Sequence, residues 1–180
     1  MQAPASLHTE RLFLRRPHPS DAEAIFRRYA SDPTVTRYMS WPTHGSVEET
    51  RGFIAWAEAD WAQWPAGSYL VFLRDNPAHL LGGTGIHFST SGQALTGYVF
   101  AQDAWGKGYA TETLRAMATL APAIGLRRLQ VVCHVDHHAS ARVIEKCGFC
   151  FEGILPAHTL FPNLAPGVAL DVRSYALDFC

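Results

Sequence analysis

The stretch Trp105-Gly106-Lys107-Gly108-Tyr109-Ala110-Thr111-Glu112 sets the organisation of the chain. Residues 95–101, which precede it, are rich in aromatic and β-branched side chains and predict a strand. Apolar residues recur at helical spacing from Ala110 to Ala121 and predict a helix. The two glycines therefore lie in a short turn at a helix N-terminus, where backbone N–H groups and the helix dipole favour an anion. We expect this turn to bind a phosphate-bearing cofactor.

Two other phosphate-binding turns are excluded by their spacing. A P-loop separates its glycines by four residues and continues with Lys and Ser or Thr, which this stretch does not do. The dinucleotide fingerprint G-x-G-x-x-G requires a glycine where this chain has Thr111. A lone Gly-x-Gly turn is also compatible with an ordinary strand-to-helix connection, so the assignment of a cofactor needs further motifs.

The composition is that of an ordinary globular domain. Of the 180 residues, 48% are hydrophobic and 17% are charged, and the formal net charge is −1. This balance, without any run of Lys or Arg, argues against nucleic acid as a partner. No apolar run has the length of a membrane span, and the first residues lack the features of a secretory signal. We therefore expect a cytoplasmic protein with no membrane partner, in which the cysteines are free thiols.

The rest of the chain predicts one domain at residues 9–180 after a loose tail at residues 1–8. Helix starts are marked by two capping boxes and one aspartate, namely Ser20 with Glu23, Ser46 with Glu49, and Asp136. The predicted strands are residues 11–16, 69–73, 80–88, 95–101, 129–135, 149–155 and 168–179. Between the last two strands, residues 156–167 are predicted to form a long loop.

Three stretches share their order and spacing with the motifs of a known family. They are Thr9-Glu10-Arg11-Leu12 with Leu14-Arg15, then Gly97-Tyr98-Val99 followed by the turn at 105–112, and finally Ser140-Ala141-Arg142-Val143-Ile144-Glu145-Lys146-Cys147-Gly148-Phe149 with Glu152-Gly153. Together they resemble the GNAT superfamily of acyl-CoA-dependent N-acyltransferases, and more closely its RimJ/RimL-like branch. The resemblance covers nearly the whole chain, and linked motifs are far more specific than one glycine turn.

The resemblance implies a fold and a cosubstrate. The fold would be α/β (α+β mixed) and GNAT-like, with a central twisted mixed sheet of about seven strands, splayed in the middle and flanked by about four helices. Acetyl-CoA would lie in the opening between the strands at 95–101 and 129–135. Its pyrophosphate would be held by Trp105, Gly106, Lys107, Gly108, Tyr109, Ala110 and Thr111. Its pantetheine would pair with the backbone of Val99, Phe100 and Ala101, and one of these amides would stabilise charge on the thioester oxygen.

Two further positions are assigned by the resemblance. Ser140 matches a position that hydrogen-bonds the departing thiol, which makes it a candidate catalytic residue and a cofactor contact. His137 stands where the branch usually has Asn, and it either donates a hydrogen bond to the pantetheine or leaves that contact unmade. The acidic residue often found just before Gly97-Tyr98 is missing, because Leu95-Thr96 stands there. A carboxylate base is therefore not carried over.

The candidate base is a histidine. An alkyl amine is protonated at neutral pH and must lose a proton before it attacks a thioester. His87 ends a predicted strand on the expected substrate side, and His44 and His158 lie in predicted loops able to cover that side. The histidines at 134, 137 and 138 lack the spacing of metal ligands, so no metal is expected.

The sequence thus predicts an acetyl-CoA-dependent N-acetyltransferase that transfers the acyl group directly to a primary amine. The acceptor is either a protein N-terminal amine or a small-molecule amine, and we expect a monomer or homodimer. The alternative is a catalytically idle acyl-CoA-binding module, which the missing carboxylate and the change from Asn to His137 suggest. Turnover separates the two, because an idle module binds acetyl-CoA without releasing free thiol.

Overall fold

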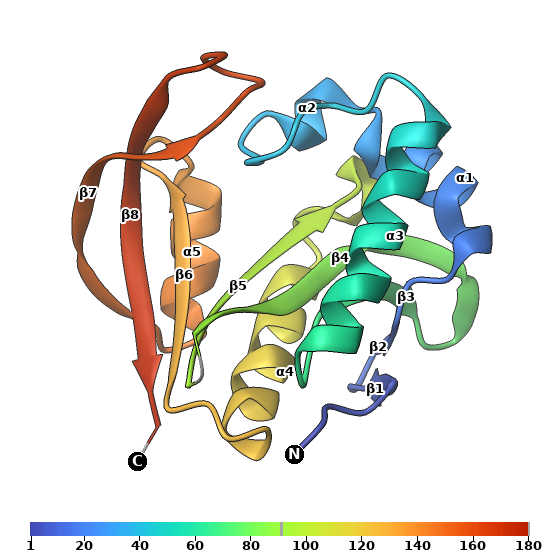
Figure 1. Ribbon diagram of the computed structural model, residues 1–180, viewed down its shortest axis with the longest axis horizontal. Coiled ribbons are helices and arrows are strands. Elements are labelled where there is room, and N and C mark those ends of the chain that lie inside the picture. The colour runs from blue at the N-terminus through green and yellow to red at the C-terminus, as the bar shows by residue number, and fades with distance from the viewer. Residues whose placement is uncertain (91, 180) are drawn as a thin grey trace.

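The computed structural model describes residues 1–90 and 92–179, which form eight strands and five α-helices. The strands are β1 (Ser6–His8), β2 (Leu12–Arg15), β3 (Ser68–Leu73), β4 (Asn76–Thr90), β5 (Gln93–Phe100), β6 (Arg128–His134), β7 (Cys150–Leu160) and β8 (Ala169–Asp178). The helices are α1 (Ala22–Ile25), α2 (Pro33–Thr36), α3 (Val47–Gln63), α4 (Tyr109–Ala123) and α5 (His138–Lys146). The strands form one sheet in the order β1-β2-β3-β4-β5-β6-β8-β7 (Figure 1). The predicted mixed α/β fold is confirmed, with one more strand and one more helix than expected in this part of the chain.

The sheet parts between β5 and β6, as the resemblance implies. These strands run parallel and pair only at Gln93 with Arg128, Ala94 with Leu129 and Leu95 with Gln130. Beyond that junction β5 stays with β4, and β6 stays with β8 along its whole length. Figure 1 shows the two strands diverging from a common end. The backbone groups on the facing edges of the gap are therefore not used for strand pairing beyond the junction.

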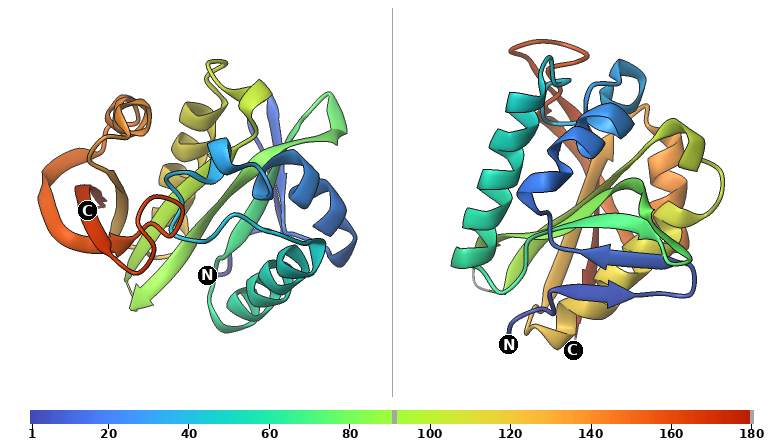
Figure 2. Two further views of the ribbon diagram at one scale, coloured as in Figure 1. Left: turned by 90° about the horizontal axis from the view of Figure 1, so that it is seen from above. Right: turned by 90° about the vertical axis from the view of Figure 1, so that its right-hand side faces the viewer.

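Helices cover both faces of the sheet (Figure 2). On one face α1 and α3 pack on the strands and bury Ile25 and Ile54 in one apolar cluster. On the other face α4 and α5 bury Leu114, Met117 and Ile144 in a second cluster. The helical spacing after the glycine turn predicts the buried positions of α4 because those side chains lie on one side of the helix.

The first residues are not a loose tail. Residues Ser6–His8 form β1, which pairs antiparallel with β2 and extends the sheet. Ahead of it, Ala3 is buried and its N–H donates to the Pro65 carbonyl at 2.7 Å. A strand of this length has too few residues to show an alternating pattern, and backbone pairing with an edge strand supplies its stability instead.

Two helix starts differ from the predicted caps. The first helical turn begins at Pro19, and His18 rather than Ser20 is its N-cap, with the Asp21 carboxylate bonded to the His18 N–H at 2.7 Å. Arg15 forms an ion pair with Asp21 at 2.7 Å and holds it in that place. The cap of α5 is His137, not Asp136. At α3 the predicted residue Ser46 is the N-cap, although Glu49 bonds the N–H of Gly45 instead.

The predicted loop at 156–167 is shorter than expected. β7 continues to Leu160 through an irregular register with β8, so His158 lies in a strand and not in a loop. The irregularity includes Ala157, whose φ of +47° departs from the extended backbone of a regular strand. Within the described residues the free cysteines are Cys133, Cys147 and Cys150, and Cys180 lies outside them. No helix in this part of the chain has the length and hydropathy needed to cross a membrane.

Candidate active site

A cleft of about 720 Å³ opens where β5 and β6 part. Its floor is formed by β4 and β5, one wall by α3 with residues 38–44, and the other wall by β6 with the start of α5. The side chains that line it include Trp41, Phe53, Trp56, His87, Tyr98 and Ser140. The gap in the sheet therefore adjoins a concave site with several aromatic side chains in its lining, which is typical of sites for small organic ligands.

The glycine turn lies directly before α4, as predicted. Gly106 has φ +73° and Gly108 has φ +81°, a left-handed backbone that glycine adopts without a steric penalty. The N–H of Glu112 bonds the Gly108 carbonyl at 3.1 Å and is the first such bond of the helix. The three helical N–H groups before it point out of the helix end, where an anion is favoured.

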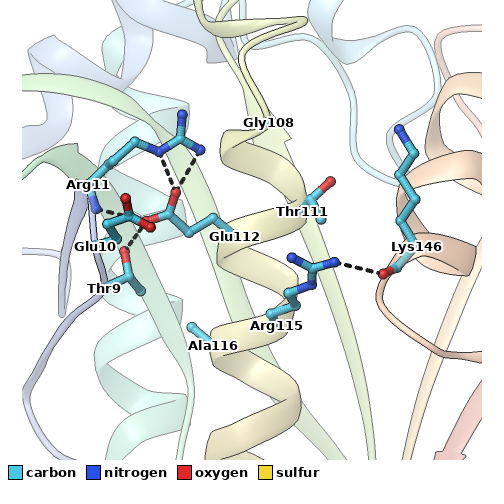
Figure 3. Close-up of a pocket in the computed structure, with 9 residues that line it drawn as sticks. All are labelled: Thr9, Glu10, Arg11, Gly108, Thr111, Glu112, Arg115, Ala116 and Lys146. Atoms are coloured by element: carbon cyan, nitrogen blue, oxygen red, sulfur yellow. Dashed lines mark hydrogen bonds and ion pairs between the residues drawn. The ribbon is translucent and has the colours of Figure 1, made fainter.

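Glu112 ties the glycine turn to the N-terminal strands (Figure 3). Its carboxylate accepts hydrogen bonds from the Thr9 hydroxyl at 2.6 Å, the Arg11 N–H at 2.9 Å and the Arg11 Nε at 2.7 Å. Arg11 also donates to the Lys107 carbonyl at 2.9 Å and lies over the Tyr109 ring. Burial raises the pKa of Glu112, but these hydrogen bonds outweigh burial and hold it below its ordinary value. The motif at residues 9–15 thus holds the turn at residues 105–112 in place through these hydrogen bonds.

A second pocket, of about 650 Å³, adjoins this turn (Figure 3). It is lined by Thr9, Glu10, Arg11, Gly108, Thr111, Glu112, Arg115, Ala116 and Lys146. Arg115 donates to the Lys146 carbonyl at 3.1 Å and thereby joins α4 to the end of α5. Three cationic side chains, of Arg11, Arg115 and Lys146, and two carboxylates, of Glu10 and Glu112, line this pocket. Arg11 is paired with Glu112, whereas Arg115 and Lys146 share the pocket with the start of α4, an arrangement that suits a phosphorylated ligand.

The expected pantetheine contacts lie at the end of β5, and their backbone groups point to different sides. The Ala101 N–H donates to the Leu81 carbonyl at 2.9 Å, on the β4 side. Alternate residues of a strand direct their backbone groups to opposite sides, so Val99 also faces β4 and Phe100 faces the gap. The Trp105 indole donates to the Phe100 carbonyl at 2.7 Å. Of the three amides, Phe100 is therefore the one placed in the gap, while that of Ala101 is engaged elsewhere.

Ser140 and Tyr98 meet across the gap. The Tyr98 hydroxyl lies 2.9 Å from Ser140 Oγ, and Ser140 is 9% exposed in the first turn of α5. Burial raises the pKa of Tyr98 above its ordinary value, although the bond to Ser140 opposes the shift. Burial also raises the pKa of the neighbouring Cys133 thiol to about 11. These groups are thus neutral at pH 7. The sequence drew attention to Tyr98 only through its Gly-Tyr pair, because the contact with Ser140 spans 42 residues.

His137 lines the same cleft at the start of α5. Its ring stacks on Tyr38 with a centroid separation of 4.5 Å. Burial, together with the neighbouring histidines at 134 and 138, lowers the pKa of His137 to about 4. The ring is therefore neutral at pH 7 and carries one N–H donor.

The three histidines predicted as candidate bases do not all lie at the cleft. His87 and His44 line the cleft, whereas His158 is not among the described residues that do so. His87 Nδ1 lies 3.1 Å from an Asp60 carboxylate oxygen, and its ring lies 5.3 Å from that of Trp56. His44 Nδ1 lies 2.8 Å from the Thr50 hydroxyl, and burial lowers the pKa of His44 although Glu49 opposes this.

Asn163 connects the two walls above the cleft. Its side-chain amide donates to the Thr36 carbonyl at 2.7 Å and to the Trp41 carbonyl at 2.9 Å. Its oxygen accepts the Thr43 N–H at 2.9 Å. Asn163 lies in the loop that connects β7 to β8. Its side chain therefore joins the segment before α3 to the far half of the sheet. No local sequence pattern marks this contact, because its partners are about 120 residues away.

The predicted site residues therefore fall into two neighbouring groups. Val99, His137, Ser140 and His87 line the cleft, while Gly108 and Thr111 line the second pocket. The rest of the turn connects the end of β5 to α4. Among the residues that the structure describes, no group of three or more His, Cys, Asp or Glu side chains has the arrangement of a metal site.

The chain is similar to acetyltransferases in sequence and in structure. The family model described as an acetyltransferase (GNAT) domain matches residues 11–150. The uncharacterized N-acetyltransferase YoaA of Bacillus subtilis (strain 168) is 30% identical over 174 residues, which cover 95% of each chain. The microcin C7 self immunity acetyltransferase MccE, solved with acetyl-CoA and AMP, matches with a TM-score of 0.86 and 20% identity over 98% of each chain. RimL, a ribosomal L7/L12 alpha-N-protein acetyltransferase solved with coenzyme A, matches with a TM-score of 0.82 and 24% identity over 98% of this chain and 97% of that one.

Proposed function

Because the chain belongs to the acetyltransferase (GNAT) family, we propose that it transfers the acetyl group of acetyl-CoA directly to a primary amine in the gap between β5 and β6. The observation that carries this proposal is that β5 and β6 part where the cleft opens, and that the glycine turn follows the end of β5. The glycine turn lies at the start of α4, and the cleft is lined both by α3 and by the start of α5. In the proposed reaction, an acceptor in the cleft meets a cofactor that extends from the turn along β5.

The turn of α4 fits the pyrophosphate of this cosubstrate. Acetyl-CoA supplies an acyl group already activated as a thioester. Gly106 leaves the turn open, since a Cβ built there would meet nothing within 4 Å. The N–H groups of the first helical turn face the same opening, and Arg115 and Lys146 add positive charge beside it. Trp105 fixes the start of the turn through its bond to the Phe100 carbonyl.

Three groups of the chain support the transfer step. The Phe100 N–H faces the gap and is placed to stabilise the oxygen that gains negative charge during the attack. Ser140 Oγ, held by Tyr98, is placed to hydrogen-bond the departing sulfur. Because both hydroxyls are neutral at pH 7 and weak acids, they orient the leaving group more than they protonate it. His137 supplies one N–H donor to the pantetheine arm from the side of α5.

The acceptor is a primary amine on a protein N-terminus or a small molecule. The cleft favours acceptors with an apolar group next to the amine, because Trp41, Phe53 and Trp56 line it. Glu49 is the one carboxylate among its described lining residues, which is too little negative charge to recognise a polyamine.

Calorimetric titration with acetyl-CoA, free CoA and ATP tests the cofactor first. We expect micromolar binding of both CoA species and none of ATP. Thiol release with a panel of peptides, small aromatic amines and polyamines then tests transfer. Binding without thiol release for any amine would identify an idle acyl-CoA-binding module. No binding of either CoA species would overturn the assignment of the cofactor site.

A further inference from the structure

We propose that His87 is the group that takes the proton from the acceptor amine, and that Asp60 is the residue that positions it. This inference rests on the proposed transfer to an amine, and it assigns the general base of that reaction. The geometry that supports it is a histidine at the cleft whose Nδ1 is held by a carboxylate. His87 comes from β4 and Asp60 from α3, so two rigid elements hold the pair.

The contact with Asp60 fixes which nitrogen of His87 accepts a proton. The two groups are 3.1 Å apart at Nδ1 and Oδ2. An ionised carboxylate only accepts hydrogen bonds, so Nδ1 carries the hydrogen and Nε2 keeps a lone pair. Asp60 is well buried, with 12% of its side chain exposed, whereas His87 has 36% exposed at the cleft. This is the arrangement in which a carboxylate orients an imidazole base in hydrolases.

The free nitrogen lies over Gly85 of β4, on the floor of the cleft. A Cβ built at Gly85 would come within 2.7 Å of His87 Nε2, so the ring lies back along β4 over that glycine. Gly85 pairs with Gly97, which is two residues beyond the last pair between β5 and β6 at Leu95. A Cβ at Gly97 would meet nothing within 4 Å, so open space adjoins this point of the floor. An ammonium group in that space gives its proton to Nε2 before the amine reaches the thioester, because Phe100 lies three residues further along β5, about 10 Å away at the rise of a strand.

The other bases at the cleft are less suited to this role. His44 is bonded to the Thr50 hydroxyl rather than to a carboxylate. His137 lies on the side of α5 assigned to the cofactor, and its ring is stacked on Tyr38. The Glu49 carboxylate accepts the Gly45 N–H at 3.0 Å and serves the start of α3. His87 is therefore the base with both an orienting carboxylate and a face on the cleft.

The proton balance of the reaction follows from this placement. The ammonium form of the acceptor gives one proton to His87 Nε2, and Asp60 stabilises the resulting imidazolium. The nitrogen lone pair then forms the C–N bond, and the C–S bond breaks with its electron pair going to sulfur. The second proton leaves the nitrogen to solvent, and the departing sulfur, oriented by Ser140, takes up one proton from solvent. His87 returns its proton to solvent, so the products are an amide, a free thiol and one proton.

The test compares His87→Ala and Asp60→Asn with the wild type on the best acceptor of the panel. We expect kcat to fall about 100-fold or more for His87→Ala and about 10- to 100-fold for Asp60→Asn. The KM for acetyl-CoA and the unfolding midpoint are expected to stay unchanged. Glu58→Gln is the matched control, because Glu58 is an exposed carboxylate on the same helix. We expect it to retain wild-type kcat.

Two readouts separate a base from a merely structural residue. Added imidazole should restore part of the activity of His87→Ala, since it can occupy the space of the missing ring. The loss should also be smaller for a weakly basic amine, which is already neutral at the assay pH and needs no base. A structural defect would reduce turnover of both kinds of amine equally and would not respond to imidazole.

The outcomes distinguish this inference from the proposed function. An active wild type with equally active His87→Ala and Asp60→Asn variants overturns the inference and leaves the proposed function standing. An active wild type whose variants lose turnover equally for strongly and weakly basic amines also overturns it. A wild type that binds acetyl-CoA but acetylates no amine overturns both.

Discussion

At the scale of single residues, two glycines of the sheet differ in the space available for a side chain. A Cβ at Gly82 would lie 2.0 Å from the Val99 carbonyl oxygen, whereas one at Gly97 would meet nothing within 4 Å. We expect Gly82→Ala to lower the free energy of unfolding by about 1–3 kcal/mol, because backbone atoms of β5 must move. Gly97→Ala should leave it unchanged or raise it by up to about 1 kcal/mol. Urea unfolding of both variants measures this, and equal stability would contradict the close approach of β4 and β5.

Glu112 makes the stability of the protein depend on pH. Its pKa in the folded state is held below the ordinary value, so its contribution to stability is present above the unfolded pKa and is lost as pH falls through the folded pKa. We expect Glu112→Gln to cost about 1–3 kcal/mol at pH 7, and the difference from wild type to shrink below pH 4. Denaturant unfolding at several pH values measures both.

The control for Glu112 is a carboxylate on the surface. Glu48 pairs with Arg51, but 69% of its side chain is exposed. We therefore expect Glu48→Gln to cost only about 0–1 kcal/mol. A loss as large as that of Glu112→Gln would show that burial of the Glu112 network is not the cause.

At the scale of an element, the N-terminus of α4 is expected to bind the phosphates of the cofactor. Gly108→Asp places a negative charge against the expected phosphates and should reduce acetyl-CoA affinity by about 100-fold or more. Gly108→Asn has nearly the same shape without the charge and should lose less. Gly125→Asp, at the other end of the helix with φ +87°, carries similar backbone strain and should keep its affinity. Calorimetry measures all three, and equal losses would contradict a phosphate site at the turn.

Elements with their own periodic pattern could be predicted from the sequence, and contacts between elements could not. α4 and β5 were identified because their apolar spacing is local. The caps at His18 and His137 were missed, since histidine is an unusual cap and the stronger signals were at Ser20 and Asp136. The His87 candidate came from its position at a strand end, but its partner Asp60 lies 27 residues away on another element. Only the packing of α3 on the sheet brings them together.

Asn163 holds the two halves together at the scale of the whole molecule. We expect Asn163→Ala to speed hydrogen exchange of the Thr43 amide by about 10-fold or more, because its acceptor is removed. The KM for the amine should also rise, since the segment before α3 lines the cleft. Asn163→Asp keeps the acceptor for Thr43 and loses the two donated bonds, so it should retain more protection of that amide. Unchanged exchange in Asn163→Ala would contradict the connection.

The parting of β5 and β6 has a consequence for the protein in the cell. Where most sheets use a neighbouring strand, this one leaves the edge of β5 unpaired with β6 beyond Leu95, and the proposed cosubstrate, a soluble metabolite, would take that place. A ligand that binds only the folded chain adds to its resistance to unfolding by mass action, about 2.7 kcal/mol at 100 times its dissociation constant. The lifetime of this protein against proteolysis should therefore follow the supply of coenzyme A, and starvation for that metabolite would shorten it even where the gene is expressed as before.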